Sequence, residues 1–538
     1  IRVGPGASQG IILRSDTFLE IGNPEAGSAA FLVWTDKPSL VSDGRITLVG
    51  PDIPESPDAS LPFGQVLIVG GGPGGRISYM ALRRMGVSSV TLVSNEEPTV
   101  ICSLPYGVGR RLVPGGPEEV VVDLAKPSRM PADILKDVLS GTVRSLDAAS
   151  RRAVVDTAEG PVTVAFETVI LAPGAAPWMP PLPGILREIP GPREGTEVVW
   201  GDEWVDKGAL REHVHVLRGA GDARRLDALA SRGGRAVVVG SGAIGLEVAE
   251  ALVDRGVAVT MAEVLPHVVS ALDEELASRV EARLRERGVT VRTGVRPVEV
   301  TSRGLGLQGG ELLEGDAVVF ATGVRPSVRL ARELGARVEK GIVVDGQGRT
   351  SVAGVLAVGD AVQVEDGATG MPLLPLIGTL AMRQGLVAAA TVVGMPWGLP
   401  PATVWGLSEI FGLHWGSVGW TVEAATRAGL PVISLTQPVR TRDPFMPAGH
   451  EGVWKLTVAA AEEKGLRRGQ ILGFQVVQEG DSPLFLAERF IDIITRRETV
   501  PELFGHYFIH SPAHNAVDDP YLNLIFQACV VIQQLYGL

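Results

Sequence analysis

Short apolar runs bounded by glycines alternate with amphipathic stretches along most of this chain. Residues 66–69 read Val-Leu-Ile-Val, a glycine-rich turn follows at 70–75, a helical pattern runs through Leu82, and another apolar run occupies 90–93. Apolar runs of this length between glycines are typical of strands buried on both faces of a parallel sheet. The pattern therefore predicts a strand–turn–helix–strand unit at residues 66–93.

The same plan recurs about 170 residues later. Residues 236–239 read Ala-Val-Val-Val, the turn Gly-Ser-Gly-Ala-Ile-Gly follows at 240–245, a helical pattern runs through Leu252, and an apolar run occupies 258–261. Each unit has a later echo, Val-Ile-Leu-Ala-Pro-Gly ending at Gly174 and Val-Val-Phe-Ala-Thr-Gly ending at Gly323. This duplication predicts an α/β chain with two nested doubly wound dinucleotide-binding domains.

The order of these units and the Pro-rich stretches between them suggest the domain limits. We expect the first doubly wound domain to comprise residues 63–199 and 321–395, with the second domain, residues 200–320, inserted in it. Alternating strand patterns such as 452–458 and 471–477, each with helical stretches after them, predict an α+β domain at 396–538. Residues 1–62 form a small β-rich appendage.

Composition and charge narrow the function classes. The chain has 538 residues, 45% of them hydrophobic, and a formal net charge of −12, which argues against nucleic-acid and anionic-membrane partners. No apolar run reaches the length of a membrane span. With two cysteines, a disulfide framework and a thiolate metal cluster are excluded, and a reducing compartment such as the cytoplasm is expected. The printed chain begins at Ile1, so a targeting signal ahead of it would not be visible.

The two glycine-rich turns carry the first chemical signal. Gly70, Gly72 and Gly75 in one turn, and Gly240, Gly242 and Gly245 in the other, fit the Gly-x-Gly-x-x-Gly spacing that lets a backbone approach a pyrophosphate at a helix N-terminus. A lone motif of this kind can be a turn that merely packs. Two copies, each between a strand and a helix, favour two dinucleotide sites.

Acidic residues after the turns indicate which nucleotides bind. Glu263 ends the strand after the second turn, where a carboxylate accepts ribose hydroxyls and repels a 2′-phosphate, so NADH is preferred to NADPH. In the first unit the equivalent position is Ser94, and Glu96 is the best candidate for the ribose contact. Asp360, directly after Gly359 at a strand end, suits a polyol chain, although such a pair alone is often just a turn.

Together these segments resemble the two-dinucleotide-binding flavoprotein disulfide reductases, over residues 63–535. The resemblance implies FAD in the first domain, a nicotinamide nucleotide in the second, and a homodimer formed through the last domain. It assigns FAD to Gly70, Gly72, Gly75 and Asp360, and it assigns NAD to Gly240, Gly242, Gly245 and Glu263, with Glu247 matching the Glu that follows the second glycine motif of the family. Glu96, Gly174, Gly359 and Gly323 are further candidate cofactor-binding residues.

A second short motif sets the subgroup. Residues 101–106 read Ile-Cys-Ser-Leu-Pro-Tyr, and Gly107 stands where dithiol members carry a second cysteine, so an internal redox disulfide is excluded. The stretch resembles the single-cysteine branch of coenzyme A disulfide reductases, persulfide reductases and NADH oxidases. That resemblance implies that Cys102 sits against the flavin and cycles as a mixed disulfide with coenzyme A or as a sulfenic acid.

The residues around Cys102 point the same way. A helix start follows it, and Arg110 and Arg111 are close in sequence, so we expect the helix dipole and these cations to lower the pKa of the Cys102 thiol. The alternative is a buried structural cysteine. Cys529 shares a helical face with Leu522 and Ile525 and is expected in the core.

A histidine cluster near the C-terminus departs from the family pattern. His506, His510 and His514 fall within nine residues, and no carboxylate or cysteine completes a metal site. His510 occupies the place of a Tyr typical of single-cysteine members. We hypothesise that His510 or His514 of a second copy reaches Cys102 and stabilises its thiolate or protonates a leaving thiol. The alternative is a surface or interface cluster.

The N-terminal appendage carries a weaker resemblance. Residues 18–24 (Phe-Leu-Glu-Ile-Gly-Asn-Pro) and 41–53 are similar to a short segment of the acetyl-CoA synthase subunit that partners carbon monoxide dehydrogenase. The resemblance implies a docking module for a one-carbon or corrinoid enzyme, and a small β cap without that role is the alternative.

These signals predict an FAD-dependent, NADH-linked oxidoreductase that reduces a disulfide or persulfide, with a coenzyme A-type thiol as the leading substrate. Two alternatives stay open. One is an NADH oxidase or peroxidase that works through a cysteine sulfenic acid. The other is an electron-transfer subunit docked to a partner enzyme through residues 1–62.

Overall fold

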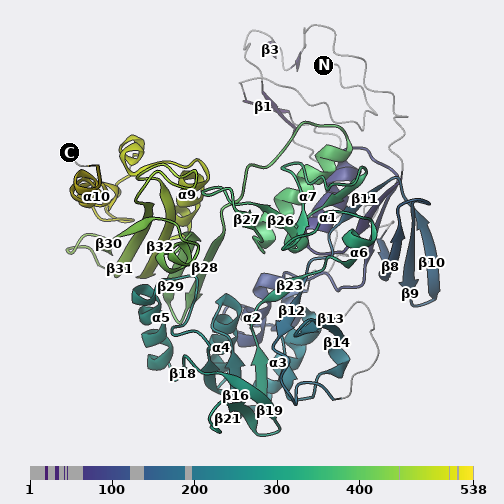
Figure 1. Ribbon diagram of the computed structural model, residues 1–538, viewed down its shortest axis with the longest axis horizontal. Helices are drawn as coiled ribbons and strands as arrows, with labels where there is room; N and C mark the ends of the chain where they lie inside the picture. Colours follow the sequence, from purple (N-terminus) through teal and green to yellow (C-terminus); the bar gives the residue numbers. More distant parts are fainter. Residues whose placement is uncertain are drawn as a thin grey trace.

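The computed structural model in Figure 1 describes most of the chain after residue 64. The described residues are 65–121, 138–187, 197–447, 449–507, 509–517 and 520–536, together with four short strands nearer the N-terminus. Those strands pair as β1 (Phe18–Ile21) with β2 (Phe31–Trp34) and β3 (Val41–Ser42) with β4 (Arg45–Ile46). The rest of the predicted docking segment lies outside the described residues.

A five-stranded parallel sheet carries the first glycine-rich turn. Its strand order is β25-β11-β5-β6-β7, so a strand from far along the chain closes one edge. All four residues of the central strand β5 are buried, as expected for a parallel sheet covered on both faces. The strands are β5 (Val66–Val69), β6 (Val90–Ser94), β7 (Val138–Ser140), β11 (Thr168–Leu171) and β25 (Val355–Ala357).

Helices α1 (Pro73–Arg84) and α7 (Gly378–Val392) pack side by side on this sheet (Figure 1). They approach closely because glycines face each other: a Cβ on Gly385 would lie 2.3 Å from the Gly74 carbonyl oxygen. The Ser78 hydroxyl donates to the Gly385 carbonyl at 3.1 Å. The first turn of α7, which comes late in the chain, also lies beside the first glycine turn, because a Cβ on Gly74 would lie 3.1 Å from the Ala381 carbonyl oxygen.

A second parallel sheet repeats the plan around the second glycine turn. Its order is β15-β22-β16-β17-β18, with helices α3, α4 and α5 packed on it. The elements are β15 (Val214–His215), α3 (Ala220–Arg232), β16 (Arg235–Val239), α4 (Ala243–Asp254), β17 (Ala258–Ala262), α5 (Glu274–Glu286), β18 (Thr290–Arg292) and β22 (Ala317–Phe320).

The C-terminal part contains an antiparallel sheet in the order β28-β29-β32-β31-β30, with α9 packed on it. One apolar core joins it to the second parallel sheet, because Trp415 and Val477 cluster with Leu276 and Val280 of α5. The elements are β28 (Trp405–Ile410), β29 (Leu413–Gly419), α8 (Val422–Arg427), β30 (Val432–Arg440), β31 (Glu451–Ala459), β32 (Ile471–Glu479), α9 (Leu484–Thr495), the 3₁₀ turn η7 (Val500–Gly505) and α10 (Pro520–Tyr536).

Smaller sheets and turns complete the described structure. They are ordered β10-β9-β8, β14-β13-β12-β23, β19-β20-β21 and β24-β26-β27. Their strands are β8 (Thr142–Asp147), β9 (Arg152–Thr157), β10 (Gly160–Ala165), β12 (Ala175–Met179), β13 (Glu197–Trp200), β14 (Glu203–Asp206), β19 (Pro297–Thr301), β20 (Gly304–Leu307), β21 (Leu312–Glu314), β23 (Val324–Pro326), β24 (Ile342–Val343), β26 (Val362–Glu365) and β27 (Pro372–Leu373), and α6 spans Arg329–Glu333.

The predicted fold class is confirmed. The strand–turn–helix–strand units at 66–93 and 236–261, and their echoes β11 and β22, form the centres of two doubly wound parallel sheets. The domain limits stay a prediction. Among the described residues, no helix is both long enough and apolar enough to cross a membrane. The helix expected around Cys529 forms as α10, in which Ile525 is buried and Leu522 is exposed; the Cys529 side chain lies outside the described residues.

Candidate functional site

The first glycine-rich turn connects β5 to α1 and is closed by backbone contacts. Gly70 has φ +106°, and a Cβ there would lie 2.0 Å from the Ala172 carbonyl oxygen, while a Cβ on Gly75 would lie 1.9 Å from the Gly70 carbonyl oxygen. A Cβ on Gly72 would meet nothing within 4 Å. Two of the glycines are therefore needed for packing, and the middle one leaves open space in front of the N-terminus of α1.

That open space belongs to a cavity of about 1620 Å³. Its wall includes Gly70 and Gly72 of the turn, Glu96 after β6, and Met382 of α7. The open cradle at Gly72, the size of the cavity and the helix N-terminus beside it fit the diphosphate and the long body of FAD. Glu96 lines the cavity, and its contact with a ribose stays a prediction.

Gly174 and Asp360 lie close to Arg218, and Gly359 immediately precedes Asp360. Gly174 has φ +69°, and its missing Cβ would lie 3.4 Å from an Arg218 guanidinium nitrogen. Asp360, in the 3₁₀ turn η6 (Gly359–Ala361), has a carboxylate oxygen 3.8 Å from the same guanidinium group. Burial raises the pKa of the Asp360 carboxyl, and Arg218 opposes that shift. Arg218 lines the cavity, and no motif in the sequence had marked it.

The second glycine turn, between β16 and α4, has the same construction. Gly240 has φ +97°, and its Cβ would lie 2.5 Å from the Ala321 carbonyl oxygen, while a Cβ on Gly245 would lie 2.1 Å from the Gly240 carbonyl oxygen. A Cβ on Gly242 would again meet nothing within 4 Å. Gly323, with φ +97°, follows the neighbouring strand β22 two residues after Ala321. The open space at Gly242 fits the close approach of a second dinucleotide.

Glu263 follows β17 and is held beside this turn. One carboxylate oxygen accepts hydrogen bonds from the Ser241 amide at 2.9 Å and the Ser241 hydroxyl at 2.6 Å, and the other accepts one from the Leu265 amide at 2.9 Å. The neighbouring strand β18 ends at Arg292, but the Arg292 guanidinium is paired with Glu311 at 2.7 Å. Glu263 is therefore the charged group fixed at the glycine turn, while the nearby cation is paired elsewhere.

Cys102 lies in the 3₁₀ turn η2 (Ile101–Ser103), immediately before α2 (Leu104–Gly109), and is exposed. Its Sγ lies 4.0 Å from where a Cβ on Gly378 would stand, so the thiol faces the first residue of α7. The adjacent Ile101 lines the large cavity. The thiol therefore stands at the edge of the proposed flavin site, beside a helix N-terminus.

The expectation that arginines lower the pKa of Cys102 is wrong. Arg110 is paired with Asp227 at 2.8 Å, and Arg111 is paired with Glu250 at 2.7 Å, so both guanidinium groups are neutralised on α3 and α4. Desolvation by the surrounding chain raises the pKa of the Cys102 thiol, and the Glu247 and Asp360 carboxylates raise it further. The Arg218 guanidinium opposes this rise in the pKa of Cys102.

Glu247 lies on α4, two residues after Gly245, and its carboxylate faces α2 and β28. One oxygen accepts hydrogen bonds from the Ser408 hydroxyl at 2.8 Å and the Tyr106 hydroxyl at 3.3 Å. Burial raises the pKa of Glu247, and burial with the nearby carboxylate raises the pKa of Tyr106 to about 12. The predicted nucleotide residue thus forms a three-way contact near Cys102, which sequence spacing could not reveal because Ser408 is 161 residues away.

We expect Glu247→Gln to lower the pKa of Cys102, because it removes a negative charge that disfavours the thiolate. Iodoacetamide should then alkylate Cys102 faster than in the unmodified protein at the same pH near neutrality, and the difference in rate should disappear as the pH rises. Glu286→Gln, on the exposed side of α5, is the matched control. An unchanged or slower alkylation rate in Glu247→Gln would contradict this electrostatic account.

The histidine cluster forms separate pairs in one copy of the chain. His510 Nε2 lies 3.9 Å from an Asp443 carboxylate oxygen, His514 Nδ1 lies 3.1 Å from the Ser511 hydroxyl, and His506 pairs with Glu498 at 2.6 Å. The contacts of His510 and His514 are thus with their own chain, and the predicted reach to a second copy stays a prediction. Within the described part of the chain, no three histidine, cysteine or acidic side chains are grouped to hold a metal ion.

Comparison with known proteins identifies the family to which this architecture belongs. Residues 64–385 match the pyridine nucleotide-disulphide oxidoreductase family. The chain belongs to this family. The predicted enzyme class, FAD-dependent NAD(P)H oxidoreductase, is thereby confirmed, as is the cofactor pair of FAD and a nicotinamide nucleotide.

Among its relatives, an NADH oxidase of Methanocaldococcus jannaschii is 27% identical over 470 residues, which cover 85% of this chain and 96% of the relative. An NAD(P)H coenzyme A polysulfide/persulfide reductase of Pyrococcus horikoshii is 25% identical over 440 residues, 78% of this chain and 89% of that protein. The structure of an NAD-dependent persulfide reductase from A. fulgidus has a TM-score of 0.76 and 25% identity, and the match covers 88% of this chain and 84% of that one. This oxidoreductase thus resembles members named for sulfur reduction and members named as NADH oxidases.

Proposed function

We propose that this enzyme uses NADH to reduce a disulfide or persulfide of a coenzyme A-type thiol, through the single redox cysteine Cys102. The observation that carries the proposal is the exposed Cys102 thiol at the cavity edge beside the start of α7. The chain has two cysteines in all, and Gly107 replaces the second cysteine of a dithiol pair. The likeness to persulfide reductases supports the same chemistry.

The two glycine turns supply the proposed cofactor sites. FAD, when bound, accepts two electrons from the nicotinamide nucleotide and makes them available for sulfur reduction. The proposed FAD residues are Gly70, Gly72, Gly75, Glu96, Gly174, Gly359 and Asp360. The proposed NADH residues are Gly240, Gly242, Gly245, Glu247, Glu263 and Gly323. NADH is favoured over NADPH because the Glu263 carboxylate is fixed where a 2′-phosphate would approach.

Cys102 performs the proposed sulfur chemistry. Its thiolate attacks one sulfur of the substrate, an Sγ–S bond forms, the substrate S–S bond breaks, and the other half leaves as a thiolate. Two electrons and one proton then split the mixed disulfide into the Cys102 thiolate and a second free thiol. In a homodimer, His510 or His514 of the second copy is proposed to supply a proton to a departing thiol.

Exposed apolar side chains support a homodimer formed through the C-terminal elements. They lie on the loop after β30, on α9, after η7 and on α10. Among them are Phe445, Phe485, Tyr507, Ile509, Phe526 and Val530. Large exposed apolar side chains gathered on one part of a chain are typical of interfaces.

An NADH oxidase or peroxidase is the second candidate, favoured by the Methanocaldococcus jannaschii relative. In that reaction the Cys102 thiolate attacks one oxygen of a peroxide, an S–O bond forms as the O–O bond breaks, and the leaving hydroxide or alkoxide takes up a proton to become water or an alcohol. Two electrons and two protons then reduce the sulfenic acid to thiol and water.

One assay compares the two candidates. Purified holoenzyme is given NADH with coenzyme A disulfide, hydrogen peroxide or oxygen, and kcat/KM is measured for each acceptor. We expect the disulfide to be preferred by at least about tenfold, with free thiol released, and NADPH to be at least about tenfold poorer than NADH. A higher kcat/KM for peroxide or oxygen would favour the second candidate, and an NADPH preference would contradict the role of Glu263.

A further inference from the structure

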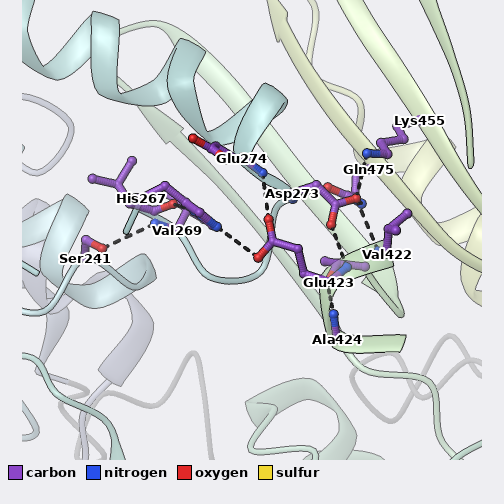
Figure 2. Close-up of polar contacts among 12 residues, drawn as sticks. Ser241, His267, Val269, Asp273, Glu274, Val422, Glu423, Ala424, Lys455 and Gln475 are labelled. Atoms are coloured by element: carbon purple, nitrogen blue, oxygen red, sulfur yellow. Dashed lines mark hydrogen bonds and ion pairs between the residues drawn. The ribbon is translucent and has the colours of Figure 1, made fainter. Parts of the chain in front are cut away.

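The loop between β17 and α5 makes hydrogen bonds to the second glycine turn at one end and to the C-terminal sheet at the other (Figure 2). At its start, Glu263 accepts two hydrogen bonds from Ser241 of the turn. Farther along, the Val269 amide lies 3.2 Å from the Ser241 carbonyl oxygen and 3.3 Å from the Ser241 hydroxyl oxygen. The loop is thus bonded to the turn on both sides of His267.

His267 is buried, with 5% of its surface exposed, and both ring nitrogens face oxygen atoms. Nδ1 lies 2.7 Å from the Val268 carbonyl oxygen, and Nε2 lies 3.1 Å from an oxygen of the Glu423 carboxylate. Neither oxygen carries a hydrogen to donate when Glu423 is ionised. A neutral imidazole has one N–H, so it satisfies one of these contacts, whereas the doubly protonated ring satisfies both.

The charged groups around His267 favour the protonated ring. Glu423 faces it from α8 and Glu274 faces it from the first turn of α5, and both are acidic. Burial alone would lower the pKa of His267, but the hydrogen bonds to Val268 and Glu423 raise it more. A raised folded-state pKa means that the contact is complete below the ordinary pKa and is lost as the pH rises through the raised one.

Glu423 is itself fixed by a reciprocal contact between α5 and α8. Its other carboxylate oxygen accepts the Glu274 amide at 3.0 Å, while the Asp273 carboxylate accepts the Val422 amide at 3.2 Å and the Glu423 amide at 3.0 Å. Each acid thus caps the N-terminus of the other helix. Figure 2 shows that Asp273 also contacts Lys455 and Gln475 of the C-terminal sheet. Both carboxylate oxygens of Glu423 therefore have partners, one on His267 and one at the start of α5.

We infer that His267 is a positioning residue for the nicotinamide nucleotide: its doubly protonated ring holds Glu423 and keeps the 263–269 loop against the second glycine turn. Loss of the ring proton leaves one of the two ring contacts unmade and weakens the anchor of the loop that presents Glu263, so nucleotide affinity falls as the pH rises. The inference rests on the proposed nucleotide site at this turn. It goes beyond that site by giving it a proton-dependent anchor in the C-terminal part of the chain.

The test measures the Kd of NADH with the full FAD-loaded enzyme, by rapid mixing that follows bleaching of the flavin absorbance. Between about pH 6 and about pH 9, we expect the Kd to rise about tenfold, with little change in the limiting rate of reduction. His267→Gln retains a donor without a titrating ring, so its Kd should stay flat over this range. Glu423→Gln should flatten it as well. His414→Gln, whose ring faces the Gly480 carbonyl, should keep the unmodified profile.

Two results would overturn the inference: a flat NADH Kd in the unmodified enzyme, or a tenfold rise retained in His267→Gln. Thermal unfolding is measured in parallel, because a merely structural role would lower the melting temperature without flattening the Kd profile. Glu263→Ala distinguishes a failure of the proposed nucleotide site from a failure of the His267 anchor. An unchanged Kd in Glu263→Ala would contradict the nucleotide site itself, whereas a weakened Kd there with an unmodified profile in His267→Gln would contradict the histidine anchor alone.

Discussion

Cys102→Ser is expected to lose reduction of coenzyme A disulfide by at least about 1,000-fold while NADH-dependent reduction of a dye stays within about twofold. Serine keeps the shape of the side chain but cannot form the mixed disulfide. The thiol stands in the turn before α2, at the edge of the cavity, so the substitution should leave both glycine turns intact. Steady-state kinetics with coenzyme A disulfide and with the dye measures the loss of one activity and the retention of the other.

Ser103→Ala, one residue farther along the same turn, is the matched control and should retain both activities. Flavin content per chain, read from the visible spectrum, shows that each variant is loaded equally. Retention of every activity in Cys102→Ser would instead favour an electron-transfer subunit, in which electrons pass to a partner enzyme and Cys102 has no role. A pull-down with and without residues 1–62 would then test whether that segment docks the partner.

Substitution of the middle glycine in either turn should have the second large effect, a loss of cofactor binding. Gly72 and Gly242 both have extended backbone, with φ −69° and −70°, and a Cβ at either position would meet no protein atom within 4 Å. Valine is therefore tolerated by the fold, and its side chain fills the space that a pyrophosphate needs. Gly72→Val should bind FAD at least about tenfold more weakly. Gly242→Val should keep FAD but lose at least about 100-fold of NADH-dependent turnover.

The test compares flavin content and NADH-dependent turnover between these two variants. Each serves as the control for the other, and Gly505→Val, at another glycine whose Cβ would meet nothing within 4 Å, controls for the substitution itself. Flavin content and the NADH concentration dependence are measured for all three. Loss of flavin in Gly242→Val with retention in Gly72→Val would reverse the assignment of the two cofactors to the two turns.

Local sequence patterns were sufficient for the fold class and for the two glycine turns. An apolar run such as 66–69 and the glycines after it lie within about a dozen residues of each other. The strand, the turn and the helix can therefore be predicted without knowledge of the tertiary structure. The placement of Glu263 beside the second turn follows from the same local unit.

Contacts between distant segments could not be predicted from the sequence. The expectation that Arg110 and Arg111 lower the pKa of Cys102 was wrong for this reason. Arg110 and Arg111 are near Cys102 in sequence, but acids on α3 and α4 pair with them, and those helices come more than 100 residues later. Arg218 beside Asp360, Ser408 beside Glu247 and Glu423 beside His267 are likewise set by packing between sheets. Periodicity and spacing carry no information about such pairs, so the charge environment of the thiol had to come from the structure.

The most direct test of the central claim is mass spectrometry of the holoenzyme after it has been mixed with coenzyme A disulfide and no NADH. We predict one coenzyme A adduct per chain on the peptide that contains Cys102, released when NADH is added, with Cys529 unmodified. An unmodified Cys102 in enzyme that still reduces coenzyme A disulfide would contradict the account.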